Sequence, residues 1–212
     1  MYPKKNTYEG KFVVFEGIAK SGKSSRAKIL AEKLQNRGCD VLLTKEPTDS
    51  LAEGRRVIKV CKSEKDIKDP KALERDFHIA CVKHIKNEIV PALKRGTIVI
   101  ADRSFFSALA YGFALRVDKK FLYDLSQDIL IPDIMFFMHT TPSLVCKRLS
   151  EQKRHRCLFE KEKYLRAIFG AYQSIIRDFL SKTHIRILMG DLHEEYMLSK
   201  QMDKYVNLVA KN

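Results

Sequence analysis

The residues with the clearest chemistry form an unbroken phosphate-loop motif, GxxxxGKS, between Gly17 and Ser24. Glycines in such a loop let successive backbone N–H groups turn toward phosphate oxygens, and the amino end of the following helix adds partial positive charge. In this motif Lys23 reaches the β- and γ-phosphates of a nucleoside triphosphate, and the Ser24 hydroxyl ligates magnesium. The alternative is a glycine-rich turn without a ligand. We predict that the triphosphate is bound by Gly17, Ile18, Ala19, Lys20, Ser21, Gly22, Lys23, Ser24 and Ser25.

An acidic and a basic residue stand together where a second apolar run ends. Asp102 and Arg103 directly follow Ile98-Val99-Ile100-Ala101. The carboxyl ends of parallel strands meet at one edge of a sheet, so this pair is predicted to lie beside the phosphate loop. Asp102 would hold magnesium directly or through water, and Arg103 would clamp a second phosphate in a fork geometry that lysine lacks. The alternative is a structural Asp–Arg ion pair.

A third group of basic side chains lies in the segment KRLSEQKRHR, from Lys147 to Arg156. We predict that residues 147–158, approximately, form a short basic lid that closes over the phosphates and excludes water. Arg154 and Arg156, with Lys20 of the phosphate loop, are expected to stabilise the transferring group, and Arg148 to contact the triphosphate. The alternative is a solvated basic helix face.

These side chains need a sheet to position them. Near-continuous apolar runs predict strands buried on both faces of a parallel sheet, and a run that begins with polar–apolar alternation predicts an edge strand. The four buried runs are residues 12–15, 41–43, 98–101 and 134–138, and the edge run is 184–189. Helical periodicity between them predicts an α/β fold of three layers, with a five-stranded parallel sheet flanked by helices, in one domain over residues 1–212. The helical pattern at about 70–95 contains Pro91, which is expected to kink it.

Composition narrows the class of protein. The chain has 212 residues, a hydrophobic fraction of 45% and a formal net charge of +14, so it is not globally disordered. No apolar run approaches the roughly 18 residues of a membrane span, and five scattered cysteines without a CxxC pair favour reduced thiols in the cytoplasm. The positive charge suggests a polyanionic partner or a solvated helix surface. Without NKxD, DxxG or LSGGQ motifs, small phosphoryl-transfer kinases are the favoured class of phosphate-loop protein.

Together these segments resemble the thymidylate kinase family of P-loop nucleoside monophosphate kinases. The resemblance covers nearly the whole chain and rests on FVVFEG with GKS, LLTKEPT, DPKALERDFHIA, PALKRGTIVIADR, SxxAY, IPDIMFFM and LFEKEKYLRAIFGAY. It implies ATP and Mg²⁺ as donor, a nucleoside monophosphate as acceptor and a homodimer. It also implies that Lys23, Asp102 and Arg103 are catalytic, and that Phe77 stacks on the acceptor base.

The acceptor half departs from the family pattern at several positions. The residues implied for acceptor binding are Lys45, Phe77, Cys81, Arg103, Ser107 and Tyr111. Ala19 replaces an Asp that helps to hold the acceptor sugar, Lys45 replaces an Arg, and Cys81 replaces the Arg that recognises the edge of the base. Ser104 replaces an aromatic residue, and Gly112 a polar one. The donor half keeps the family residues.

The function favoured by the resemblance is ATP-dependent phosphorylation of a nucleoside monophosphate, dTMP to dTDP in first place. One alternative is a kinase for another nucleotide or for a nucleoside, with a reshaped acceptor pocket. Another is a catalytically weak P-loop protein that binds nucleotide or nucleic acid. The charge supports nucleic-acid binding, whereas Lys23, Asp102, Arg103 and the basic segment argue for catalysis.

Overall fold

A parallel five-stranded sheet forms the centre of the computed structural model, which describes residues 4–152, 157–180, 186–190 and 195–209. Its strand order is β3-β4-β2-β6-β7. The strands are β2 (Phe12–Glu16), β3 (Val41–Lys45), β4 (Ile98–Asp102), β6 (Ile134–Met138) and β7 (Arg186–Gly190). The predicted α/β fold with five parallel strands is therefore confirmed, with β7 at an edge of the sheet.

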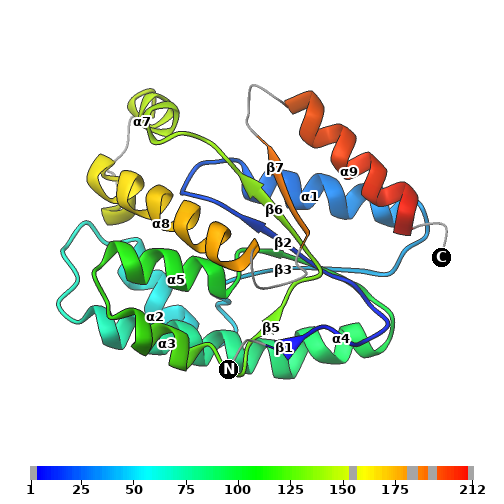
Figure 1. The fold of residues 1–212 in the computed structure, drawn as a ribbon, viewed down its shortest axis with the longest axis horizontal. Helices are drawn as coiled ribbons and strands as arrows, with labels where there is room; N and C mark the ends of the chain where they lie inside the picture. Colours follow the sequence, from blue (N-terminus) through cyan, green and yellow to red (C-terminus); the bar gives the residue numbers. More distant parts are fainter. Residues whose placement is uncertain (1–3, 153–156, 181–185, 191–194, 210–212) are drawn as a thin grey trace.

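Helices cover both faces of this sheet (Figure 1). One face carries α1 (Lys23–Gln35) and α9 (Glu195–Val209). The other helices are α2 (Ala52–Cys61), α3 (Pro70–His84), α4 (Val90–Lys94), α5 (Phe105–Ala114), α6 (Lys119–Leu125), α7 (Pro142–Ser150), α8 (Glu162–Leu180), the π-helical η1 (Ile85–Ile89) and the 3₁₀ turn η2 (Leu158–Glu160).

Alternation along β2 divides the core into two clusters. Val13 and Phe15 point toward α1 and α9, whereas Phe12 and Val14 point toward the face that carries α3, α5 and α8. Successive side chains of a strand lie on opposite faces, so a strand that is buried on both sides must be apolar throughout. This is why the apolar run before Glu16 was visible in the sequence.

The long helix predicted at about 70–95 departs from α-geometry just before Pro91. Residues Ile85–Ile89 are π-helical, and the Val90 N–H reaches back to the Ile85 carbonyl oxygen. Proline removes one backbone donor and crowds the carbonyl four residues earlier. The wider turn relieves that conflict, so the predicted distortion is a π-bulge in the turn before the proline.

A second, two-stranded sheet was not predicted. Strands β1 (Lys4–Lys5) and β5 (Leu130–Ile131) form a separate parallel pair. Each contains only two residues, which is too short for a hydrophobic period to appear in the sequence.

Across the described ranges, no helix has the length and apolar character needed to cross a membrane.

Candidate active site

The phosphate loop joins the carboxyl end of β2 to the amino end of α1. Two of its glycines adopt backbone conformations that would be strained for any other residue type. Gly17 has φ +142°, and a Cβ there would lie 2.8 Å from the Met138 carbonyl oxygen. Gly22 has φ 92° and is the residue before α1. Lys20 also has a positive φ, of 58°, which turns the loop back toward the helix. The backbone is thus shaped as a phosphate loop requires.

Lys23 is buried at the start of α1. Its Nζ donates a 2.7 Å hydrogen bond to the carbonyl oxygen of Ile18. Burial, and then the nearby charge of Arg103, lower the pKa of Lys23 to about 7, while Asp102 and Glu16 act in the opposite direction. A phosphate placed in the loop would supply the negative charge that this ammonium group lacks.

Ser24 and Asp102 bring α1 and β4 together. The Ser24 hydroxyl donates a hydrogen bond to Asp102 Oδ2, and Asp102 Oδ1 is buried without a hydrogen-bond partner among the described residues. A carboxylate oxygen left free beside a hydroxyl suits Mg²⁺, which prefers oxygen ligands and takes its remaining ones from phosphates and water. The residues present therefore fit the predicted ion.

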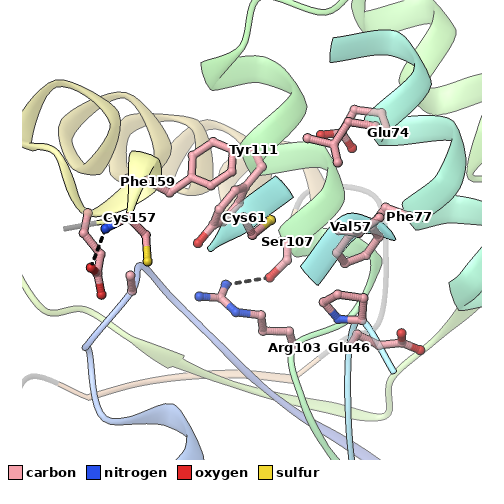
Figure 2. A pocket seen from close by; sticks show the side chains of 14 residues that line it. Glu46, Val57, Cys61, Glu74, Phe77, Arg103, Ser107, Tyr111, Cys157 and Phe159 are labelled. Atoms are coloured by element: carbon pink, nitrogen blue, oxygen red, sulfur yellow. Dashed lines mark hydrogen bonds between the residues drawn. The ribbon is translucent and has the colours of Figure 1, made fainter. Parts of the chain in front are cut away.

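Arg103 lies immediately after β4 with a φ of 78°. Its Nη1 donates hydrogen bonds to the Gly17 carbonyl oxygen at 3.2 Å and to Ser107 Oγ at 2.9 Å. Its guanidinium lies 5.2 Å from the centre of the Tyr111 ring. Arg103 thus connects the phosphate loop with α5, and Figure 2 shows its guanidinium beside Ser107 among the side chains that line a cavity.

Glu16, the last residue of β2, organises the surroundings of Arg103. Its fully buried carboxylate accepts hydrogen bonds from the Ser104 N–H and Oγ, both at 2.7 Å, and from Ser107 Oγ and the Tyr172 hydroxyl, both at 2.8 Å. Burial raises the pKa of Glu16, while the Arg103 charge and these hydrogen bonds oppose the shift. The sequence reasoning missed this residue, although an acidic residue that ends a buried strand was a visible signal.

A cavity of about 220 Å³ adjoins the phosphate loop (Figure 2). Its lining comes from the loop, from the segment after β3, and from α2, α3, α5 and η2. The lining includes five residues that the sequence analysis singled out, namely Ala19, Phe77, Arg103, Ser107 and Tyr111. Phe77 is 8% exposed, so its ring faces this cavity from within the core.

Two residues implied for acceptor binding lie outside this lining. Cys81 is 1% exposed and borders a much smaller void with Ser104 and Phe105. Lys45 is exposed and pairs with Asp49 at 2.8 Å. Neither position brings its side chain into the cavity that Phe77 and Arg103 share.

The departures at Ser104 and Gly112 have structural explanations. Ser104 caps α5 through its hydroxyl, which accepts from the Phe106 N–H, and it also donates to Glu16. At Gly112, a Cβ would lie 2.7 Å from a methyl carbon of Leu122. A side chain at position 112 would therefore require the Leu122 side chain to shift.

The basic segment is described only in part. Arg148, in the last turn of α7, donates a 3.3 Å hydrogen bond to the Lys20 carbonyl oxygen, which places it against the phosphate loop. Lys20 itself is exposed. Arg154 and Arg156 lie outside the described residues.

The fold and this site together define a class of protein. A parallel sheet with the phosphate loop between its central strand β2 and helix α1, and an acidic residue at the end of the adjacent β4, is the arrangement of P-loop nucleotide-binding proteins.

The family model of thymidylate kinase matches residues 15–195. The chain belongs to the thymidylate kinase family, a family of nucleoside monophosphate kinases. A probable thymidylate kinase of Thermococcus kodakarensis is 36% identical over 148 residues, which cover 67% of this chain and 72% of that protein. A thymidylate kinase of Brachyspira hyodysenteriae is 31% identical over 173 residues, covering 81% and 84%.

A solved structure extends the similarity to the fold. The thymidylate kinase from Candida albicans superposes with a TM-score of 0.75 at 20% identity, covering 97% of this chain and 95% of that one. At this identity the likeness establishes the shared fold, in agreement with the strand order described above.

Proposed function

We propose that this protein transfers the γ-phosphoryl group of ATP to dTMP, giving ADP and dTDP. The observation that carries the proposal is the position of Lys23, Ser24 and Asp102 beside a cavity that contains Arg103 and Phe77. Donor and acceptor groups therefore have adjoining sites. Membership of the thymidylate kinase family and the names of its relatives supply the identity of the acceptor, dTMP.

The chemistry asks little of the protein beyond position and charge. A phosphate acceptor is already anionic and attacks the γ-phosphorus in line, so no general base is needed. The backbone N–H groups of residues 17–25 would hold the donor phosphates, and Lys23 would neutralise charge on the transferring group. Arg103 would hold the acceptor phosphate, with its guanidinium fixed by Ser107 and Gly17.

Mg²⁺ would be held by Ser24 and Asp102, and when bound it supplies positive charge to the phosphate oxygens. The contact of Arg148 with ATP, the charge-stabilising roles of Arg154, Arg156 and Lys20 of the phosphate loop, and a lid over about residues 147–158 stay predictions. The contact of Arg148 with Lys20 supports the first of them.

The proposal also covers the domain organisation, oligomeric state, location and partners of the protein. We expect one kinase domain over residues 1–212, a homodimer and a cytoplasmic location, as the family resemblance and the thiol content imply. Nucleic acid is not a favoured partner, because the Lys23–Asp102–Arg103 arrangement is built for a nucleotide. Mass measurement by light scattering in solution tests the dimer directly.

The activity is tested by ADP release from ATP and Mg²⁺ with a panel of nucleosides and nucleoside monophosphates. We expect dTMP to stimulate ADP release most, and Lys23→Ala to abolish the stimulation. A preference for another acceptor would identify that compound, and not dTMP, as the substrate. No stimulation by any acceptor, with ATP binding intact, would contradict the proposal.

A further inference from the structure

The acceptor cavity contains one carboxyl group that the proposed mechanism does not use. Glu74 lies on α3, three residues before Phe77, and both line the cavity. Glu74 is 2% exposed, and its Oε2 is buried with no hydrogen-bond partner in the part of the chain that the structure describes. A buried carboxyl oxygen without a partner is costly and rare in folded proteins, which points to a ligand that satisfies it.

The other acidic side chains of the lining are held by hydrogen bonds, although Glu46 Oε2, like Glu74 Oε2, is buried without a partner among the described residues. Glu46 accepts a hydrogen bond at 2.6 Å from His84 Nδ1, and Figure 2 shows its carboxylate directed away from the remaining lining residues. Glu160 accepts from the Cys157 N–H at 3.0 Å. Of the two acidic groups of this lining with an unpaired oxygen in the described part of the chain, Glu46 is directed away from the cavity, which leaves Glu74 as the candidate to contact a ligand there.

The position of Glu74 relative to Phe77 and Arg103 indicates which part of the acceptor it meets. Residues three apart on a helix are neighbours on one face, with about 5–6 Å between Cβ atoms. In Figure 2, Glu74 lies in the upper part of the view and Arg103 in the lower part, and Phe77 lies at a height between them. A nucleotide with its phosphate on Arg103 and its base on the Phe77 ring would direct the far edge of the base toward Glu74.

We propose that the Glu74 carboxyl group hydrogen-bonds the polar edge of the acceptor base and so determines which base is accepted. This inference rests on the proposed function. It explains how the cavity recognises a base although Cys81 stands where an arginine is usual and lies outside the lining. Gly112 contributes space, because a Cβ there would lie 3.3 Å from Glu74 Cδ.

The chemistry of a protonated carboxyl fits thymine. Burial raises the pKa of Glu74 well above its usual range and so favours the protonated form, which offers one donor and one acceptor. Thymine presents an acceptor, O4, next to a donor, N3–H. The two groups can form a pair of hydrogen bonds in which each oxygen of Glu74 has a partner.

The test compares Glu74→Leu and Glu74→Gln with the unmodified protein, using dTMP and N3-methyl-dTMP as acceptors. Leucine removes both hydrogen bonds, so we expect KM for dTMP to rise roughly 10- to 100-fold, with KM for ATP unchanged. Glutamine keeps a donor and an acceptor, so KM should stay within about threefold. The unmodified protein should discriminate against N3-methyl-dTMP at least about tenfold, and Glu74→Leu less than about threefold.

Stability separates recognition from a structural role. Leucine at position 74 relieves an unsatisfied buried group, so the melting temperature without ligand should stay equal or rise while dTMP binding weakens. Asp76→Asn, on the same helix but paired with Arg56 at 2.7 Å on the outside, is the matched control and should leave KM for dTMP unchanged.

The outcomes distinguish the two proposals. Turnover of dTMP with equal KM in Glu74→Leu would overturn the role of Glu74 and leave the proposed function standing. If another monophosphate is the preferred acceptor, the same comparison is made with that nucleotide, and loss of base selectivity in Glu74→Leu would support the role. Failure of every nucleoside monophosphate to bind would overturn both.

Discussion

Lys23 Nζ lies 2.7 Å from the carbonyl oxygen of Ile18, so the lysine of the phosphate loop forms a hydrogen bond across the loop that it serves. This contact satisfies one donor of a buried cation but supplies no formal negative charge. Burial, and then the charge of Arg103, lower the pKa of Lys23 to about 7, so Lys23 is poised to gain a proton when phosphate binds.

Binding of ATP should therefore be linked to proton uptake. Phosphate raises the pKa of Lys23 above about 7, so at about pH 8 the complex holds more protons than the free protein, and affinity falls as the pH rises further. Calorimetry in two buffers of different ionisation enthalpy measures the uptake. Lys23→Met should abolish it, and equal apparent enthalpies for the unmodified protein in both buffers would contradict the linkage.

Asp102→Asn should weaken the use of magnesium. The amide keeps the size of the side chain and an oxygen that accepts from Ser24, but it loses the charge beside the unpaired Oδ1. We expect the Mg²⁺ concentration for half-maximal rate to rise about tenfold or more and kcat to fall about 100-fold. Asp128→Asn, which alters an exposed pair with Lys4, is the control. An unchanged Mg²⁺ requirement would exclude Asp102 as a ligand.

Arg103→Lys should damage the acceptor side while sparing the donor side. Lysine keeps the charge but cannot hold Ser107, Gly17 and a phosphate at once. We expect kcat/KM for the acceptor to fall about 100-fold, with KM for ATP nearly unchanged. Arg116→Lys is a matched control, because Arg116 is exposed and also has a positive φ, of 59°. A rise confined to KM for ATP would place Arg103 on the donor instead.

Tyr172→Phe should reduce stability more than its contact area suggests. Its hydroxyl donates to Glu16 at 2.8 Å inside the core, and phenylalanine would leave that carboxylate short of a donor. The free energy of unfolding should fall by about 1–3 kcal/mol in urea titrations. In Tyr164→Phe, by contrast, the hydroxyl that is lost makes only a 3.5 Å exposed contact with Asp66, so little change is expected. Equal effects of the two substitutions would mean that Glu16 finds another donor.

The sequence predicted the features that depend on local pattern. Continuous apolar runs predicted the strands, because a strand that is buried on both faces of a sheet is apolar throughout. The β1–β5 pair was missed because a strand of two residues is too short to show a hydrophobic period. Glu16 and Glu74 were missed for a different reason. The place of Glu16 at the end of a buried strand was visible, but its hydrogen-bond partners, and the absence of a partner for Glu74 Oε2 among the described residues, depend on tertiary packing.

The Tyr172 hydroxyl also lies 3.4 Å from Arg103 Nη1, and Tyr172 is the middle of α8, whose first turn begins just after the basic segment. A single phenol therefore connects α8, which follows the basic segment predicted to form a lid, with the guanidinium predicted to hold the acceptor phosphate. A displacement of α8 along its axis would be transmitted to Arg103 through this one oxygen. Tyr172 is in this sense a mechanical link between α8 and the end of β4, where Arg103 lies.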